Sequence, residues 1–126
     1  MLDRTLNILT VDDELPITWS IRFALSSPGR TFASAGNGEE ALARVAPDTL
    51  PFDVIITDHN MPRVNGLELV RRLRERSFAG KIIVISAHLS CEVRQAYEAL
   101  WVDRVLAKPF DTNELRAAVD EIVLAA

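Results

Sequence analysis

Short apolar runs alternate along the chain with longer segments in which apolar residues recur at helical spacing. Runs of strand length fall at residues 6–11, 31–35, 54–57, 82–85 and 104–107. The first, third and fourth of these runs are almost continuously apolar, which predicts strands that are buried on both faces. We therefore expect these three strands to be central in a parallel sheet.

The segments between the runs carry apolar residues three and four positions apart, as one face of a helix requires. The apolar stripes consist of Ile17, Ile21, Ala24 and Leu25; Ala41, Leu42 and Val45; Leu69, Val70 and Leu73; Val93, Ala96, Tyr97 and Leu100; and Leu115, Ala118, Val119, Ile122 and Val123. The second helix, expected over 38–46, is the shortest, and Pro47 ends it. Asp111 and Glu114 have the spacing of a capping box at the start of the last helix.

This alternation predicts an α/β fold, a (βα)5 doubly wound five-stranded parallel sheet that is flavodoxin-like. Right-handed crossovers favour the strand order 2-1-3-4-5 in such a sheet. Ligands then bind at the carboxyl ends of strands 1 and 3, where the winding direction reverses. The length of 126 residues and the absence of a linker-like tract indicate a single domain over 1–126.

The composition is that of an ordinary soluble globular protein, with 48% apolar and 25% charged residues. The formal net charge is −4, and no basic run is longer than Arg71-Arg72, so we expect no direct binding to nucleic acid or to an anionic membrane. Cys91 is the only cysteine, and the apolar runs are too short for a membrane span. A cytoplasmic location is expected.

Acidic residues stand at the carboxyl ends of two of the predicted central strands. Asp12, Asp13 and Glu14 follow the first strand and Asp58 follows the third, so their side chains should open toward one crevice. Two carboxylates about 4 Å apart repel by about 4 kcal/mol at an effective dielectric of about 20, so the cluster invites a divalent cation. Oxygen-only ligands favour Mg²⁺ over zinc. The alternative is that Asp12 or Asp13 only caps the first helix.

A hydroxyl group and an ammonium group should reach the same edge of the sheet. Ser86-Ala87 follows the fourth predicted strand, and Lys108-Pro109-Phe110 follows the fifth. A lysine that follows the apolar run of Val105 and Leu106 with only Ala107 between is costly unless an anion faces it. Together with the acidic cluster, these residues predict a phosphate and metal site in which Asp58 is a carboxylate nucleophile. One Mg²⁺ would bring the pocket to a charge of about zero, so an incoming phosphoryl donor would not be repelled.

The order and spacing of these residues resemble a known family. The chain resembles the response-regulator receiver domains of two-component phosphorelay systems, and the resemblance covers its whole length. The residues that carry it are Asp12-Asp13, Asp58-His59-Asn60-Met61-Pro62, Gly66, Ser86-Ala87 and Lys108-Pro109-Phe110. It implies that Asp58 accepts a phosphoryl group from a histidine kinase, a phosphotransfer protein or a small donor such as acetyl phosphate. The resulting conformational switch would control a partner or output domain, and the chain would catalyse only its own phosphorylation and dephosphorylation.

The resemblance also implies a role for individual positions. Mg²⁺ would be bound by Asp13, Asp58 and the backbone carbonyl of Asn60, with Asp12 acting through water. The phosphoryl group would be contacted by Ser86, Ala87, Lys108 and Asn60. Pro62 and Gly66 would shape the loop into the third helix, Gly66 by permitting backbone angles that other residues resist.

Two of the positions that depart from the pattern of the family bear on its switching and its partner face. Val105 stands where the family usually has Tyr or Phe as a rotameric switch, so the usual aromatic relay is not expected. Trp101 stands in a stretch that often contains Gly-Ala. We expect Trp101, with Tyr97 or Arg104, to contribute to a partner face formed by the fourth helix, the fifth strand and the fifth helix, which a homodimer would use. Core packing is the alternative for Trp101.

Two other functions compete with a phosphorylated switch. A haloacid-dehalogenase-like phosphatase also uses a strand-end aspartate with Mg²⁺ and a lysine, but it needs a second Asp two residues after the nucleophile. Asn60 stands there, and an amide cannot protonate a leaving group. A pseudo-receiver would keep the fold as an interaction module without phosphorylation. The complete set of expected site residues disfavours it, although Val105 leaves room for unusual signalling.

Overall fold

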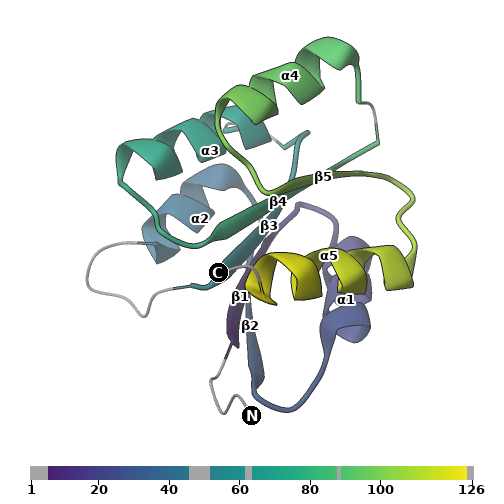
Figure 1. Cartoon of the computed structure of the whole chain (residues 1–126). Helices are drawn as coiled ribbons and strands as arrows, with labels where there is room; N and C mark the ends of the chain where they lie inside the picture. Colours follow the sequence, from purple (N-terminus) through teal and green to yellow (C-terminus); the bar gives the residue numbers. More distant parts are fainter. Residues whose placement is uncertain (1–5, 46–51, 62–63, 88, 125–126) are drawn as a thin grey trace.

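A parallel five-stranded sheet lies between two layers of helices in the computed structural model of this chain (Figure 1). The structure describes residues 6–45, 52–61, 64–87 and 89–124. The strands are β1 (Leu6–Val11), β2 (Arg30–Ala35), β3 (Val54–Asp58), β4 (Lys81–Ser86) and β5 (Arg104–Ala107). The helices of the described residues are α1 (Leu15–Leu25), α2 (Gly38–Arg44), α3 (Gly66–Glu75), α4 (Cys91–Ala99) and α5 (Thr112–Leu124).

The strand order is β2-β1-β3-β4-β5 with all neighbours parallel, which confirms the predicted doubly wound sheet. The three strands that were expected to be central, β1, β3 and β4, occupy the middle of the sheet. Every residue of β3 is buried, whereas the edge strands β2 and β5 are largely half-buried or exposed. Continuous apolar sequence therefore marks the strands that are covered on both faces.

Each face of the sheet has its own hydrophobic core. On one face, Ile8 and Ile56 pack with apolar residues of α1 and α5. On the other face, Leu9 and Ile55 pack with residues of α2, α3 and α4. Figure 1 shows this division, with α1 and α5 together on one side of the sheet. Successive strand residues alternate between the two cores because side chains along a strand point to opposite faces.

Polar side chains fix the starts of four helices by accepting a backbone N–H of the first turn. The capping contacts are Asn37 with Glu40, Asn65 with Glu68, Ser90 with Val93 and Asp111 with Asn113, at 2.8–3.1 Å. Each such cap contributes about 1 kcal/mol to helix stability. These contacts thus fix where α2, α3, α4 and α5 begin. Pro47 lies outside the described residues.

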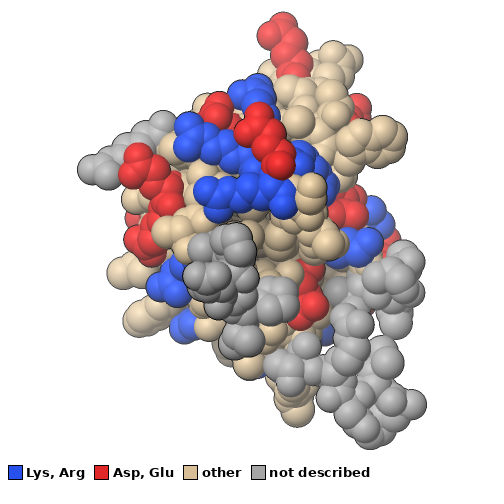
Figure 2. Space-filling view, turned by 90° about the vertical axis from the view of Figure 1, so that its left-hand side faces the viewer, with Lys and Arg blue, Asp and Glu red and all other residues tan. Residues whose placement is uncertain are grey.

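Charged side chains form mixed groups on the surface. On the face shown in Figure 2, Lys and Arg gather beside Asp and Glu. In α3, Arg71 and Arg72 each lie 2.9 Å from Glu68, and the Arg74 guanidinium donates to the carbonyl oxygens of Leu100 and Trp101. These arginines are therefore engaged in contacts within the chain. Across the described part of the chain, no helix has the length and apolar character needed to span a membrane.

Candidate functional site

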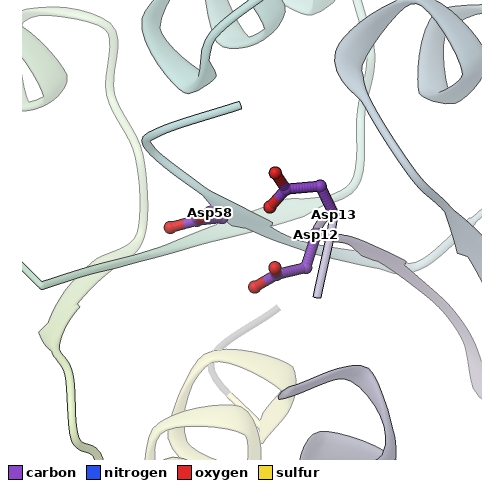
Figure 3. Close-up of side chains that lie close together, drawn as sticks. All are labelled: Asp12, Asp13 and Asp58. Atoms are coloured by element: carbon purple, nitrogen blue, oxygen red, sulfur yellow. The ribbon is translucent and has the colours of Figure 1, made fainter. Parts of the chain in front are cut away.

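Three aspartates converge at the carboxyl edge of the sheet. Asp12 and Asp13 directly follow β1, Asp58 is the last residue of β3, and these two strands are neighbours. One carboxylate oxygen from each aspartate lies within 4.8 Å of the others (Figure 3). Asp12 and Asp58 are only 5% and 6% exposed, whereas Asp13 is exposed. The predicted acidic cluster is therefore present, with its open side at Asp13.

Asp12 has a structural contact as well as a place in the cluster. Its Oδ1 accepts the backbone N–H of Glu14 at 2.9 Å, which orders the turn before α1. Its Oδ2 lies 3.4 Å from the ammonium of Lys108. Glu14 is itself the N-cap residue of α1, so Asp12 orders the turn before the helix and does not cap its first turn. The alternative that Asp12 only caps the first helix is therefore wrong, and its second oxygen belongs to the site.

Lys108 directs its ammonium group into the acidic cluster. The Nζ atom lies 3.2 Å from Asp58 Oδ1 and 3.8 Å from Glu14 Oε1, and the side chain is 13% exposed. The backbone supports this placement, because the Lys108 N–H donates to the Ser86 carbonyl at 2.8 Å. The peptide bond to Pro109 is cis. An anion faces the buried ammonium, as the sequence requires.

Opposing effects set the ionisation of these groups. Burial raises the pKa of Asp12 above its ordinary value; the Glu14 N–H and Lys108 lower it, and the nearby charge of Asp58 adds to the rise. Burial alone would lower the pKa of Lys108, but the carboxylates of Asp12 and Asp58 more than offset this, and the pKa is raised. Lys108 therefore stays charged at neutral pH. Its single ammonium does not fully offset the cost of burying the charged carboxylate of Asp12.

The remaining predicted phosphate contacts lie at the same edge. Ser86 ends β4 and is fully buried, and Ala87 after it is exposed. Asn60 is exposed and lies two residues beyond Asp58. Their contacts with a phosphoryl group stay predictions. Pro62 lies outside the described residues.

His59 and Gly66 are closely packed beside Asp58. The His59 N–H donates to Asp58 Oδ1 at 2.9 Å, and the Gly66 N–H donates to the His59 carbonyl at 2.9 Å. A Cβ on Gly66 would approach the Asp58 carbonyl oxygen to 2.7 Å. The backbone of Gly66 is not in the left-handed region, so the expectation of special backbone angles is wrong. Glycine is needed there for space.

The expected partner face is only partly formed as predicted. Trp101 is 82% exposed, and exposed Arg104 pairs with Glu121 of α5 at 2.6 Å. Val105 is half-buried. Tyr97 is fully buried, so its assignment to a partner surface is wrong. It belongs to the apolar stripe of α4, and that stripe faces the sheet.

A pocket and an apolar stripe flank the site on the side of α1. The pocket has a volume of about 430 Å³ and is lined by Ile17, Ser20, Ala87, Lys108, Pro109, Phe110 and Thr112. Leu15, Trp19 and Phe23 lie at successive four-residue intervals on α1 and are each at least 67% exposed. This stripe was not among the predicted contact residues, although the four-residue spacing was a visible signal for it.

Comparisons with known proteins agree on one family. The family model of the response regulator receiver domain matches residues 8–120. The chain is 33% identical to the DNA-binding transcriptional regulator NtrC of Salmonella typhimurium over 92% of its length and 38% identical to response regulator MprA of Mycobacterium leprae over 90%. It spans only 24% of that NtrC and 49% of that MprA. Among solved structures, chemotaxis response regulator CheY4 of Vibrio cholerae matches with a TM-score of 0.83 and 31% identity, over 94% of this chain and 98% of CheY4.

Proposed function

Because the chain belongs to the response regulator receiver domain family, we propose that Asp58 is its phosphoacceptor and that Mg²⁺ and Lys108 assist the transfer. As a receiver domain it is a signalling switch rather than a classical enzyme. In this proposal the phosphoryl group comes from a histidine kinase or a phosphotransfer protein, and the phosphorylated domain controls a partner or output domain. The chain catalyses only its own phosphorylation and dephosphorylation.

The observation that carries the proposal is the position of Asp58 between a cation and two further carboxylates. Lys108 Nζ lies 3.2 Å from its Oδ1, and the three aspartates offer oxygens within 4.8 Å of one another. A carboxylate nucleophile needs no general base, so positioning and charge neutralisation are the main requirements for transfer. Lys108 and the aspartate cluster are the groups that would position and neutralise the phosphoryl group here.

The donor set suits Mg²⁺. It consists of carboxylate oxygens, which are hard ligands, and exposed Asp13 leaves room for retained waters. Three aspartates against one ammonium leave a charge of about −2, which would repel a phosphorylated donor. Bound Mg²⁺ would neutralise this charge and orient the phosphoryl oxygens. We assign its binding to Asp13, Asp58 and the Asn60 carbonyl, with Asp12 acting through water.

In the transfer step, an oxygen of Asp58 attacks phosphorus and forms an acyl phosphate. The bond from phosphorus to the donor breaks, and the leaving group departs with the electron pair, as acetate when acetyl phosphate is the donor. Lys108 stays protonated and faces the charge that develops on the phosphoryl oxygens. Ser86 and the Ala87 backbone, at the end of β4, would donate hydrogen bonds to the product.

An apolar surface on which a protein donor could dock lies beside the phosphoacceptor Asp58. The pocket is lined by Ile17, Lys108 and Phe110, and α1, which contributes Ile17, also carries the exposed side chains of Leu15, Trp19 and Phe23. We propose that a helix of the kinase or phosphotransfer protein docks there and brings its phosphohistidine to Asp58. Trp19→Ala should lower the ratio of the kinase-driven rate to the acetyl phosphate-driven rate of phosphorylation, and an unchanged ratio would exclude Trp19 from docking.

Incubation with acetyl phosphate and Mg²⁺, followed by intact mass measurement, tests the proposed function. Wild type should gain one phosphoryl group, and Asp58→Asn or added chelator should abolish the gain. Asp53→Asn, a substitution at an aspartate that precedes β3, is the matched control and should still be phosphorylated. A wild-type protein that gains no phosphoryl group would favour an interaction module instead. Steady hydrolysis of unrelated phosphate esters would favour a phosphatase.

A further inference from the structure

Behind the loop that follows Asp58, Tyr97 reaches from α4 into the core. Its side chain is completely buried, and its hydroxyl lies 2.6 Å from Nδ1 of His59. The two rings meet edge to face, with centroids 5.5 Å apart and an interplanar angle of 79°. A polar contact therefore joins α4 to the residue next to the phosphoacceptor.

Gly66 confines the Tyr97 hydroxyl from another side. A Cβ on Gly66 would collide with this hydroxyl and with the carbonyl oxygen of Asp58. Burial, with a further contribution from the charge of Asp58, raises the pKa of Tyr97, so the hydroxyl keeps its proton for hydrogen bonding. Closely packed groups move together, so a shift of the backbone at Asp58, His59 or Gly66 is felt at the hydroxyl.

The backbone N–H of His59 makes a hydrogen bond that depends on the charge of Asp58. Its N–H donates to Asp58 Oδ1 at 2.9 Å, and the same N–H lies 3.2 Å from the Ile85 carbonyl. Phosphorylation moves the negative charge from the carboxylate to the phosphoryl group. The bond from the His59 N–H then loses its ionic acceptor and weakens, which shifts the balance toward Ile85.

At its other end, Tyr97 supports the last turn of α4. Its carbonyl accepts the N–H groups of Leu100 at 3.0 Å and Val102 at 3.4 Å, and exposed Trp101 lies between them. Val105 of β5 is aliphatic and has no side-chain group for a comparable polar link. We propose that Tyr97 is a positioning residue whose hydroxyl contact with His59 transmits the state of Asp58 to the C-terminal turn of α4. This inference rests on the proposed phosphorylation of Asp58.

Backbone amide NMR shifts, recorded with excess acetyl phosphate and Mg²⁺, test the coupling. In wild type, phosphorylation should shift the amides of His59 and of the turn at 100–102. Tyr97→Phe keeps the ring and removes the hydroxyl. In this variant the His59 amide should still shift, while the shift in the turn should fall to about half or less. Unchanged shifts in the turn would overturn the proposal.

Variants of His59 separate a polar link from general support of the fold. His59→Asn keeps a polar atom near the position of Nδ1 and should retain most of the shift in the turn. His59→Leu should lose the shift in the turn as Tyr97→Phe does. The double variant His59→Leu with Tyr97→Phe should lose no more of this shift than either single variant. Equal losses in His59→Asn and His59→Leu, at unchanged melting temperature, would contradict the proposal. A phosphorylated wild type with no shift in α4 refutes the coupling alone, whereas a wild type that takes no phosphoryl group refutes the proposed function as well.

Discussion

Lys108 and Asp58 face each other at the carboxyl edge of the sheet, with Nζ 3.2 Å from Oδ1. Asp58 ends β3 and Lys108 follows β5, so the contact crosses the end of β4, which lies between these two strands. The long side chain of Lys108 spans this distance and also reaches Asp12. One largely buried cation is thus shared by two buried carboxylates. Removing the Lys108 ammonium would leave both anions poorly compensated.

Lys108→Met should lower the free energy of unfolding by about 1–3 kcal/mol at pH 7, because it leaves buried carboxylates without their cation. The pKa of Lys108 is raised in the folded state, so its contribution is fully present below the ordinary value of 10.5 and is lost as the pH rises through the folded value. Urea unfolding at pH 7 measures the loss. Lys81→Met is the control, because Lys81 begins β4 at the amino edge of the sheet, away from Lys108, and it should change stability by about 0.5 kcal/mol or less.

Asp12→Asn should stabilise the metal-free protein at pH 7. Burial, together with Asp58, raises the pKa of Asp12 above 3.8, so the folded state binds more protons than the unfolded state between the two pKa values. The wild type therefore loses stability as the pH rises through this window, and the variant avoids that loss. Denaturant midpoints across the window measure the difference. A variant that is less stable than wild type at pH 7 would contradict this account.

Mg²⁺ should stabilise the folded protein through the three aspartates. At about ten times the dissociation constant, a ligand bound only by the folded state adds about 1.4 kcal/mol. Asp13→Asn should abolish this gain in thermal unfolding, because it removes the exposed carboxylate of the cluster. Glu14→Gln removes a neighbouring carboxylate from outside the cluster and should keep most of the gain. Equal loss in both variants would indicate nonspecific screening.

The sequence predicted the sheet and the acidic site for the same physical reason. Apolar runs mark strands that are covered on both faces, and parallel strands bring their carboxyl ends to one edge. The burial of Tyr97 was also predictable, because it stands in the apolar stripe of α4, yet its ring suggested a contact surface. The contact between its hydroxyl and His59 was not predictable, since it depends on how α4 is placed over the loop after β3.

Gly66→Ala should destabilise the fold by about 1–3 kcal/mol, the usual cost of forcing an extra methyl group into a packed interior. The new Cβ would meet the backbone of Asp58 and His59, which cannot move without displacing the phosphoacceptor, so phosphorylation by acetyl phosphate should slow as well. Gly36→Ala is the matched control, because a Cβ there meets nothing within 4 Å. Similar effects of the two substitutions would show that backbone freedom, rather than space, explains Gly66.

Trp101 has an unfavourable backbone conformation for its residue type. Its φ is 62°, in the left-handed region that glycine adopts most easily at the end of a helix. Trp101→Gly should therefore raise the free energy of unfolding by about 1 kcal/mol. A decrease would mean that the indole ring stabilises the monomer by more than the backbone strain costs.

Trp101 combines an exposed indole ring with a strained backbone, which suggests that the ring contacts another molecule. We propose that Trp101 and Arg104 contribute to a homodimer or partner contact on the face of α4, β5 and α5. Trp101→Gly should then weaken self-association of the phosphorylated protein while raising monomer stability, as measured by sedimentation and by denaturant unfolding. Trp19→Ala removes another exposed tryptophan, from α1, and should leave self-association unchanged. If Trp101→Gly associates as the wild type does, this face is not the dimer contact, because the loss of a large exposed aromatic ring would have to weaken any interface that buries it.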